Sequence, residues 1–414
     1  MHAGDSLDRR DDLDRDIVII GGGIVGSSIA YHLATRDLGR RVMVLEPDHT
    51  YARSSTTRSA AAIRTQFNLG INVEMSRFGH EFYSAASAQL SLDGELVDLQ
   101  FEDCPYLVLA APEGMARMQA AHERQRSSGA DVDLLLSAQD FARIRWLKTD
   151  GIGAATLGRN GEGWLEPRRA LHALRRRSES LGVAYVPERA AGFTLHAGRI
   201  TRVLLGNGTA LAVDTVVNAA GAQAAHVAAM VAIPLPIEAR KRSAFVFRTA
   251  TPPAHFTNLV DPTFAGRGIY ARPFRGDFLA VTSPAPAVDH HTSDLSADLT
   301  LFHDIVRPGL AKRVEGFERI ELVEAWAGHY EMNTFDQNGV IGPHPDVRNF
   351  VLACGFSGHG VMHAPAVGRG VCEWLTSGRY QTLDLTPFRF ERIAENRPLD
   401  DIQPSEHRHT AAGV

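Results

Sequence analysis

Short, continuously apolar runs alternate with glycines at the start of the chain. The segment DIVIIGGGIVGSSIAYHLATRDLGRRVMVLE, residues 16–46, predicts a buried strand, a glycine turn, a helix and a second buried strand. This order and length are those of a βαβ unit. A polar stretch follows, and a helical pattern of apolar residues then extends over about residues 69–90.

Strand-like patterns dominate the later parts of the chain. Turn residues punctuate short strands in residues 191–221, which predicts a β-meander that returns to a core strand, TVVNAAG. Residues 233–325 alternate apolar and polar positions for most of their length, which predicts an antiparallel sheet with one packed face. The apolar strand FVLAC, residues 350–354, and the glycine-rich GFSGHG that follows it close the pattern.

These patterns predict an α/β fold class, in which a Rossmann-like dinucleotide-binding domain carries an inserted antiparallel β-rich (α+β) domain. We expect the dinucleotide-binding domain in three pieces, residues 14–91, 164–232 and 326–395. The inserted domain, which we expect to contact the substrate, takes residues 92–163 and 233–325.

Composition narrows the classes of function. The 414 residues are 44% apolar and 22% charged, as in an ordinary globular protein, and the net charge of −5 offers no basic surface for nucleic acid. No run approaches 18 apolar residues, so we expect no membrane span. The three cysteines form no CxxC pair, which disfavours a disulfide framework or a zinc site and favours a cytoplasmic protein. The histidine spacings predict no metal site either.

The glycine turn after the first strand reads Gly21-x-Gly23-x-x-Gly26. In this motif the first glycine allows a tight turn, the second lets the backbone approach a pyrophosphate, and the third lets the helix lie against the strand. The helix N-terminus then meets the anion. Glu46, at the end of the second strand, suits the hydroxyl groups of an adenosine ribose and would repel a 2′-phosphate.

Further segments carry a family resemblance. The small-polar run at residues 54–57 (SSTT), the strand VVNAAG at residues 216–221 and GFSGHG together resemble the FAD-dependent amine and amino-acid oxidoreductases of the D-amino acid oxidase superfamily. The resemblance covers residues 16–392. AWAGHYEMNTFDQNGVIGPHP, residues 325–345, looks closest to proline dehydrogenase-like and sarcosine dehydrogenase-like chains. It is also similar to a mitochondrial respiratory complex I assembly factor that carries an FAD-dependent oxidoreductase domain.

The resemblance implies FAD as the cofactor. Relatives attach the flavin to a cysteine or a histidine at positions that match Gly328 and Ser59 here, so we expect the FAD to be non-covalent. The residues expected to contact it are Gly21, Gly23, Ile24, Val25, Gly26, Glu46, Ser54, Ser55, Thr56, Ala61, Ala219, Ala220, Gly221, Gly355, Ser357, Gly358, His359, Gly360, Val361 and Met362.

The resemblance also implies a catalytic set of Arg64, Tyr330, His359 and Met362. Arg64 matches an arginine that follows the flavin-threading loop, and its fork suits a substrate carboxylate. Tyr330 stands where glycine oxidase-like enzymes carry an arginine, and Met362 where a carboxylate-binding lysine is found. His359 could add a hydrogen-bond donor. We expect the neighbouring His329 to point away from Tyr330 in an extended segment.

The predicted reaction is oxidation of the C–N bond of an amino acid or N-substituted amino acid, such as sarcosine, proline or an opine, by hydride transfer to flavin N5 to give an imine. Two alternatives stay open: D-amino acid oxidase-type activity on primary amino acids, and a non-catalytic FAD-binding assembly or scaffold protein. Oxygen or another electron acceptor would reoxidise the flavin. Homo- or hetero-oligomers are compatible with the resemblance.

Overall fold

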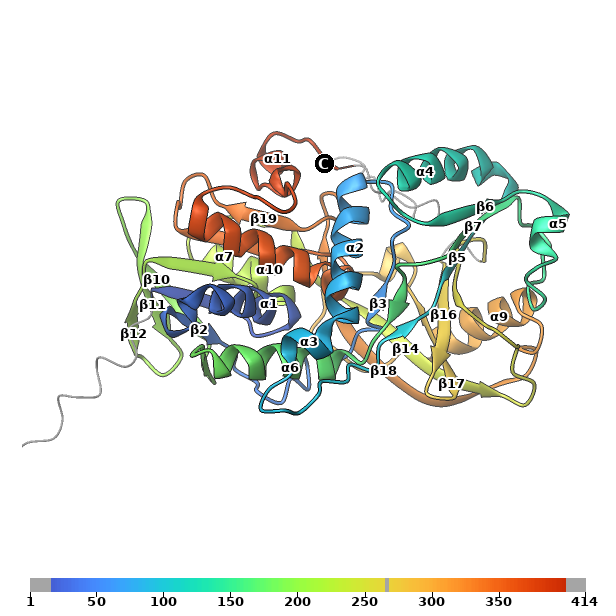
Figure 1. Cartoon of the computed structure of the whole chain (residues 1–414), viewed down its shortest axis with the longest axis horizontal. Coiled ribbons are helices and arrows are strands. Elements are labelled where there is room, and N and C mark those ends of the chain that lie inside the picture. The colour runs from blue at the N-terminus through green and yellow to red at the C-terminus, as the bar shows by residue number, and fades with distance from the viewer. Residues whose placement is uncertain (1–15, 265–267, 400–414) are drawn as a thin grey trace, which may run out of the picture.

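The computed structural model describes residues 16–264 and 268–399, and it contains a parallel-sheet domain beside an antiparallel-sheet domain (Figure 1). Neighbouring strands of the first sheet pair in parallel, except for the antiparallel edge pair β19–β20. The strand order is β19 (Val340–Pro343), β20 (Phe350–Cys354), β13 (Thr215–Asn218), β1 (Ile17–Ile20), β2 (Val42–Leu45) and β9 (Ala184–Val186). The predicted βαβ unit and the Rossmann-like fold class are confirmed.

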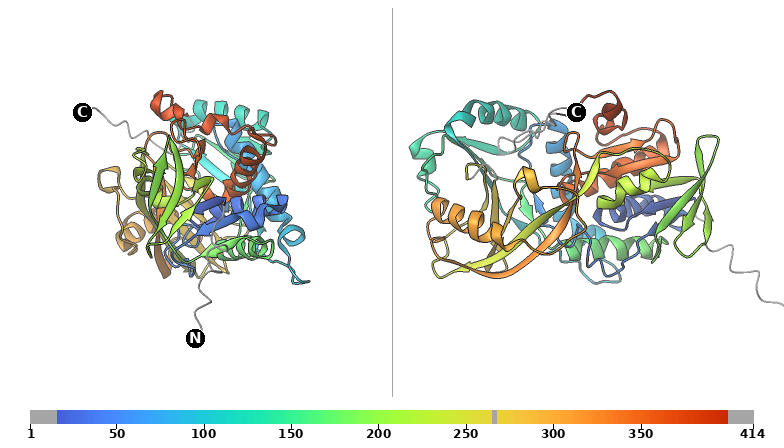
Figure 2. Two further views of the ribbon diagram at one scale, coloured as in Figure 1. Left: turned by 90° about the vertical axis from the view of Figure 1, so that its left-hand side faces the viewer. Right: turned by 180° about the vertical axis from the view of Figure 1, so that it is seen from behind.

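Helices cover the parallel sheet. Every residue of α1 (Ile24–Leu33) is buried, because α10 (Gly360–Ser377) and α6 (Pro167–Ser180) pack against it. The helical pattern expected over residues 69–90 forms two helices, α2 (Gly70–Ser84) and α3 (Ala86–Leu90). A three-stranded meander, β10 (Ala190–His196), β11 (Arg199–Leu205) and β12 (Ala210–Ala212), extends from the far end of this domain (Figure 2).

The second sheet joins both inserted segments of the chain. Its order is β18 (Ile320–Asn333), β14 (Ile237–Thr249), β17 (Asp277–Thr282), β16 (Ile269–Phe274), β15 (Asn258–Asp261), β5 (Tyr106–Ala110), β7 (Ala154–Gly158) and β6 (Val132–Leu135). Sequence patterns predict an antiparallel sheet, but β15 and β5 pair in parallel. These two strands come from different insertions, so no hairpin turn imposes an antiparallel direction on them.

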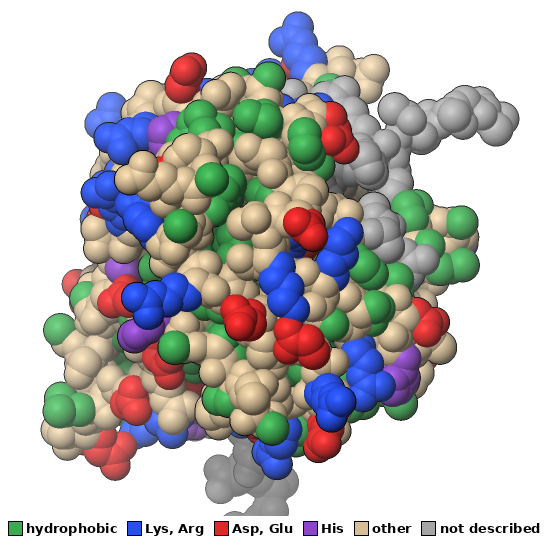
Figure 3. Space-filling view, turned by 90° about the vertical axis from the view of Figure 1, so that its right-hand side faces the viewer, with side chains coloured by type: hydrophobic (Ala, Val, Ile, Leu, Met, Phe, Trp, Pro, Cys, Tyr) green, Lys and Arg blue, Asp and Glu red, His purple; other side chains and the backbone are tan. Residues whose placement is uncertain are grey.

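Shorter elements complete the described chain. A small sheet places β8 (Gly163–Trp164) between β3 (Ala62–Ile63) and β4 (Glu102–Asp103). The remaining helices are α4 (Met115–Ser127), α5 (Ala138–Phe141), α7 (Ala224–Ala229), α8 (Leu299–Leu301), α9 (Arg307–Arg313) and α11 (Glu391–Ala394). No helix in the described ranges has the length and apolar character that a bilayer crossing requires. Charges of both signs are interspersed over the end face of the antiparallel-sheet domain (Figure 3).

The long strands β14 and β18 connect the two domains. They pair in register from Ile237 opposite Asn333 to Thr249 opposite Ile320, with one irregularity. At the Asn333 end, the backbone N–H of Asn333 donates to Ser357 Oγ at 2.9 Å, directly before α10. One end of this strand pair therefore fixes the start of α10, while the other end belongs to the antiparallel sheet.

Helix α2 braces the start of α10 from the other side. A Cβ added to Gly79 would overlap with the carbonyl oxygen of Met362, so α2 and α10 touch backbone to backbone. We predict that Gly79→Ala lowers the free energy of unfolding by about 1–3 kcal/mol, because the added methyl group would force apart two helix backbones that already touch. Glu74→Ala, at an exposed position of the same helix, should change it by less than about 0.5 kcal/mol. Urea denaturation followed by circular dichroism measures both, and equal stabilities would contradict the packing described here.

Candidate cofactor and substrate site

A cavity of about 670 Å³ lies between the two domains. Its walls come from the β1–α1 turn, the loop at residues 53–62, the segment after β13, the start of α10, and strands of the antiparallel sheet. This volume is in the range of small-molecule and cofactor sites. Chain segments more than 300 residues apart therefore line one cavity.

The β1–α1 turn forms one end of the cavity. Gly21 has a φ of +99°, and a Cβ added there would overlap with the carbonyl of Ala219. Gly23 lines the cavity, whereas Gly26 packs against Gly21 and takes no part in the lining. The carboxylate of Glu46 accepts hydrogen bonds from the backbone N–H groups of Gly22 and Asp48, both at 3.0 Å. Burial raises the pKa of Glu46, and those two bonds oppose the rise.

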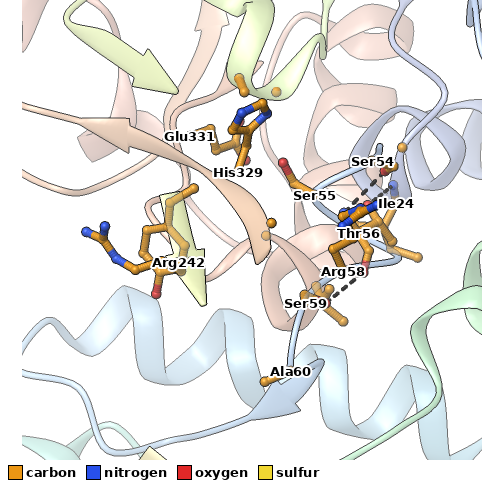
Figure 4. A pocket seen from close by; sticks show the side chains of 18 of the residues that line it. Ile24, Ser54, Ser55, Thr56, Arg58, Ser59, Ala60, Arg242, His329 and Glu331 are labelled. Carbon is orange, nitrogen blue, oxygen red and sulfur yellow. Dashed lines mark hydrogen bonds between the residues drawn. The ribbon is translucent and has the colours of Figure 1, made fainter. Parts of the chain in front are cut away.

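The small-polar loop folds over the start of α1. Thr56 Oγ1 accepts a hydrogen bond from the Ile24 N–H at 3.1 Å and so caps a helix that lacks a capping side chain of its own. Ser54 Oγ accepts from the Thr56 N–H at 3.2 Å. Figure 4 shows this loop facing His329 and Glu331 of β18 across the cavity.

The start of α10 forms another wall. Gly358, His359, Gly360, Val361 and Met362 all line the cavity. Tyr83 of α2 donates a hydrogen bond from its hydroxyl to the Val361 carbonyl at 2.8 Å. The free N–H groups and the positive dipole end of this 18-residue helix are therefore held beside the cavity, where they favour a negative charge.

Two histidines at this helix start are buried. Burial, aided by His363 and Arg64, holds the pKa of His359 well below its ordinary value. Burial likewise lowers the pKa of His363 to about 3. His363 pairs with Ser76 of α2 at 3.1 Å and packs on Phe67, so it supports the wall, and His359 faces the cavity. Both imidazoles are neutral at pH 7.

The antiparallel-sheet domain supplies the opposite end of the cavity. Tyr106 of β5 and Tyr270 of β16 stack with ring centroids 5.7 Å apart, and both line it. Arg64, just after β3, also lines the cavity with its guanidinium 4.6 Å from the centre of the Phe67 ring. Among the described residues, Arg64 Nε is buried without a hydrogen-bond partner and no carboxylate pairs with the side chain.

The strand β18 differs from the sequence-based expectation. His329, expected to point away, lines the cavity together with Tyr330, on the edge strand of the antiparallel sheet. The Arg242 guanidinium lies 4.9 Å from the centre of the Tyr330 ring and makes two hydrogen bonds, of 2.7 and 2.9 Å, to Asp289. Its side chain is 10% exposed, so the Arg242–Asp289 pair lies largely out of contact with solvent.

Most residues predicted from the sequence to contact FAD, or to form the catalytic set, line this one cavity. The exceptions, which lie behind its wall, are Gly26, Gly355 and Ser357. Sequence patterns did not identify Tyr106, Tyr270 or Glu331, because strand alternation marks a side chain as inward-facing without showing what it faces.

A buried carboxyl away from the cavity was also missed. Glu162 accepts hydrogen bonds from the Thr65 and Tyr106 backbone N–H groups at 2.9 and 2.8 Å, and from the Gln66 amide at 3.2 Å. It therefore ties the segment that follows Arg64 to the strand that carries Tyr106. No short motif surrounds Glu162, and only its burial signals this role.

Fold and cavity together define a dinucleotide-binding class of protein, in which a second, β-rich domain contributes part of the cavity wall. A family model described as FAD dependent oxidoreductase (DAO) matches residues 16–374. The chain belongs to this family of FAD-dependent oxidoreductases. The glycine turn, the carboxylate at the end of β2 and the dipole end of α10 all fit FAD, which in this family carries the redox chemistry.

Individual relatives agree with this assignment. The chain is 38% identical to FAD-dependent oxidoreductase domain-containing protein 1 of Bos taurus, over 91% of this chain and 84% of the relative. It is 25% identical to 4-methylaminobutanoate oxidase (formaldehyde-forming) of Paenarthrobacter nicotinovorans, over 87% of this chain and 43% of that longer protein. The crystal structure of L-proline dehydrogenase from P. horikoshii superposes with a TM-score of 0.81 at 25% identity, over 93% of this chain and 99% of that one.

Substitutions at Gly23 and Gly26 distinguish a residue that contacts the cofactor from one that only packs inside the protein. A Cβ added to Gly23 would lie no closer than 3.4 Å to another protein atom, whereas one added to Gly26 would overlap with the Gly21 carbonyl. We predict that Gly23→Ala leaves the melting temperature of the apoprotein unchanged and raises the Kd for FAD at least tenfold, about 1.4 kcal/mol. Gly26→Ala should lower the melting temperature of the apoprotein itself. Fluorescence titration and circular dichroism measure these effects, and unaltered FAD affinity in Gly23→Ala would remove this turn from the cofactor site.

We predict that the FAD is held without a covalent bond. Gly328 and Ser59 both line the cavity, and none of the buried cysteines Cys104, Cys354 and Cys372 does so. Precipitation with acid should therefore release all the yellow colour into the supernatant. The mass of the denatured polypeptide should equal that of the chain alone, and an added flavin mass would contradict this expectation.

Proposed function

We propose that the protein oxidises the C–N bond of a carboxylate-bearing amine, and that secondary amines of the N-substituted amino acid class are its preferred substrates. The observation that carries this proposal is Arg64, a cavity-lining guanidinium whose Nε is buried without a partner among the described residues. A buried cation without a counter-ion is costly, so the site favours a ligand that brings a negative charge.

The pairing of the neighbouring cations supports a role for Arg64. Arg242 also lines the cavity, but its guanidinium is neutralised by the bidentate contact with Asp289. The Arg58 guanidinium donates hydrogen bonds to the carbonyls of Ala52 and Ala327. Arg53, which also lines the cavity, is exposed to solvent and donates to the Ser293 carbonyl. Arg64 has no carboxylate partner among the described residues, and its fork matches a carboxylate.

The surroundings of Arg64 suit the rest of such a substrate. The stacked rings of Tyr106 and Tyr270 offer an apolar wall for an N-substituent or a ring. His359 is neutral, and both its ring and the Arg64 guanidinium pack on the ring of Phe67, at 4.9 and 4.6 Å between centres. An imidazole whose pKa is held this low is a weak base, so it can exchange a hydrogen bond with the substrate amine, which must arrive unprotonated for oxidation. Bound FAD would supply the hydride-accepting chemistry that this oxidation needs.

The relatives point to the same substrate class. The names 4-methylaminobutanoate oxidase and proline dehydrogenase both refer to secondary amines that carry a carboxylate. Tyr330, where an arginine would favour primary amino acids, lies against Gly358 beside the cavity. We infer that Tyr330 shapes the amine end of the pocket and that carboxylate binding falls to Arg64.

The flavin spectrum provides the direct test. Anaerobic addition of sarcosine, proline or an opine to the holoprotein should bleach the yellow oxidised flavin within seconds, and primary D-amino acids should act more slowly. Admitting oxygen afterwards separates an oxidase from a dehydrogenase by the rate at which colour returns. A broad panel of secondary and primary amino acids that leaves the spectrum unchanged would overturn the catalytic proposal and favour a structural role for FAD.

Arg64→Ala tests the carboxylate contact. We predict that this variant raises the Michaelis constant for a carboxylate substrate by 10²-fold or more, while the constant for the matching amine without a carboxylate changes less than threefold. Arg64→Lys keeps the charge but loses the fork, so it should lie between Arg64→Ala and the wild type. Equal losses for both substrates would remove Arg64 from the substrate site.

A further inference from the structure

Glu331 is a carboxyl group at the centre of the cavity wall that the proposed chemistry leaves unused. It follows Tyr330 on β18, pairs opposite Ala239 of β14, and lines the cavity (Figure 4). The residue is half-buried and borders the cavity. A change in this carboxyl therefore acts directly on whatever occupies the cavity.

Three glycine segments converge on the Glu331 carboxyl. Oε2 accepts a hydrogen bond from the Gly355 N–H at 3.1 Å. A Cβ added to Gly221 would lie 3.8 Å from Oε2, and one added to Gly360 would lie 3.6 Å from Oε1. Gly221 follows the segment that touches the Gly21 turn, and Gly360 opens α10. The carboxyl thus lies between the segment that follows β13 and the start of α10.

The surroundings of Glu331 provide no compensating cation. Within the described residues, no basic side chain pairs with it, because Arg240 and Arg242 on the facing strand β14 both bind Asp289. His359, at the start of α10, is neutral. Cys354, at the end of β20, interacts with Glu331, and burial keeps its thiol protonated. The segment Gly221–Gln223 contributes no titratable group.

Burial without a counter-ion raises the pKa of the Glu331 carboxyl to about 7, and backbone N–H groups of Gly355 and Phe356 oppose the rise only in part. Near neutral pH the apoprotein therefore holds a mixture of the charged and neutral forms. FAD brings two negatively charged phosphate groups and would replace solvent on the open side of the carboxyl. Repulsion and desolvation both disfavour the carboxylate, so bound FAD would shift the mixture toward the neutral acid.

We propose that Glu331 couples FAD binding to the uptake of one proton from solvent, so that the carboxyl is neutral in the complex and available as a hydrogen-bond donor to the cofactor. In this step the carboxylate oxygen gains the proton, no other bond changes, and the total charge is conserved. FAD occupancy then depends on pH over the range in which the apoprotein Glu331 loses its proton. The affinity is highest in acid, where the carboxyl is already protonated, and falls as the pH rises.

Titration of apoprotein with FAD, followed by flavin fluorescence, tests the proposal. In the wild type the Kd should rise about tenfold between pH 6 and pH 8, as expected for one linked proton with an apoprotein pKa near 7. Glu331→Gln, an uncharged isostere, should change its Kd less than twofold over the same range. Glu331→Asp retains a titratable carboxyl group, so its Kd for FAD should still rise with pH.

Glu46→Gln is the matched control, because Glu46 is a second buried carboxyl in the cavity wall. This variant should weaken FAD binding at every pH, and its Kd should change with pH as the wild-type Kd does.

Calorimetry of wild-type binding at pH 8, in two buffers of different ionisation enthalpy, should report close to one proton taken up. Zero protons, a flat wild-type profile, or a slope that survives in Glu331→Gln but vanishes in Glu46→Gln would overturn the proposal. None of these measurements requires turnover, so a failure of the proposed amine oxidation would leave the test intact.

Discussion

The site depends on main-chain segments that approach one another where no side chain fits. A Cβ on Gly21 would overlap with the Ala219 carbonyl, and one on Gly79 would overlap with the carbonyl of Met362. These contacts set the spacing between β1, β13, α2 and α10, and so bring two helix N-termini to one cavity. Close backbone packing transmits displacement, because interiors at this density cannot absorb an extra methyl group. The positions of the two helix N-termini therefore depend on the packing of all four elements.

Charge is distributed unevenly around the cavity. Arg242 is neutralised by Asp289, whereas Arg64 lacks a carboxylate partner among the described residues and Glu331 is left without a cation. His359 is kept neutral by burial. Uncompensated groups of this kind cost stability in the empty protein, which is the usual signature of a site completed by ligands. A ligand carboxylate would compensate the positive charge of Arg64, and a proton would neutralise the carboxylate of Glu331.

The two long paired strands β14 and β18 connect the two ends of the cavity. Their paired length carries Arg242, Tyr330 and Glu331 from the antiparallel sheet to the start of α10. A hydrogen bond from Asn333 to Ser357 then joins the strand end to the glycine segment. The two ends of the cavity are thereby connected by one pair of strands.

The sequence alone determined the βαβ unit, the glycine turn, the last strand and its helix, and the membership of an FAD-dependent family, because each depends on local periodicity or on residues close together in the chain. The tertiary structure decided which side chains share the cavity. It brought Tyr106 and Tyr270 together from separate insertions, paired β5 with β15 in parallel, and turned His329 inward. It also left Glu331 without a counter-ion among the residues that the structure describes, a property that no local pattern records. Burial and charge pairing depend on contacts between distant segments, and those contacts exist only after the two sheets have assembled.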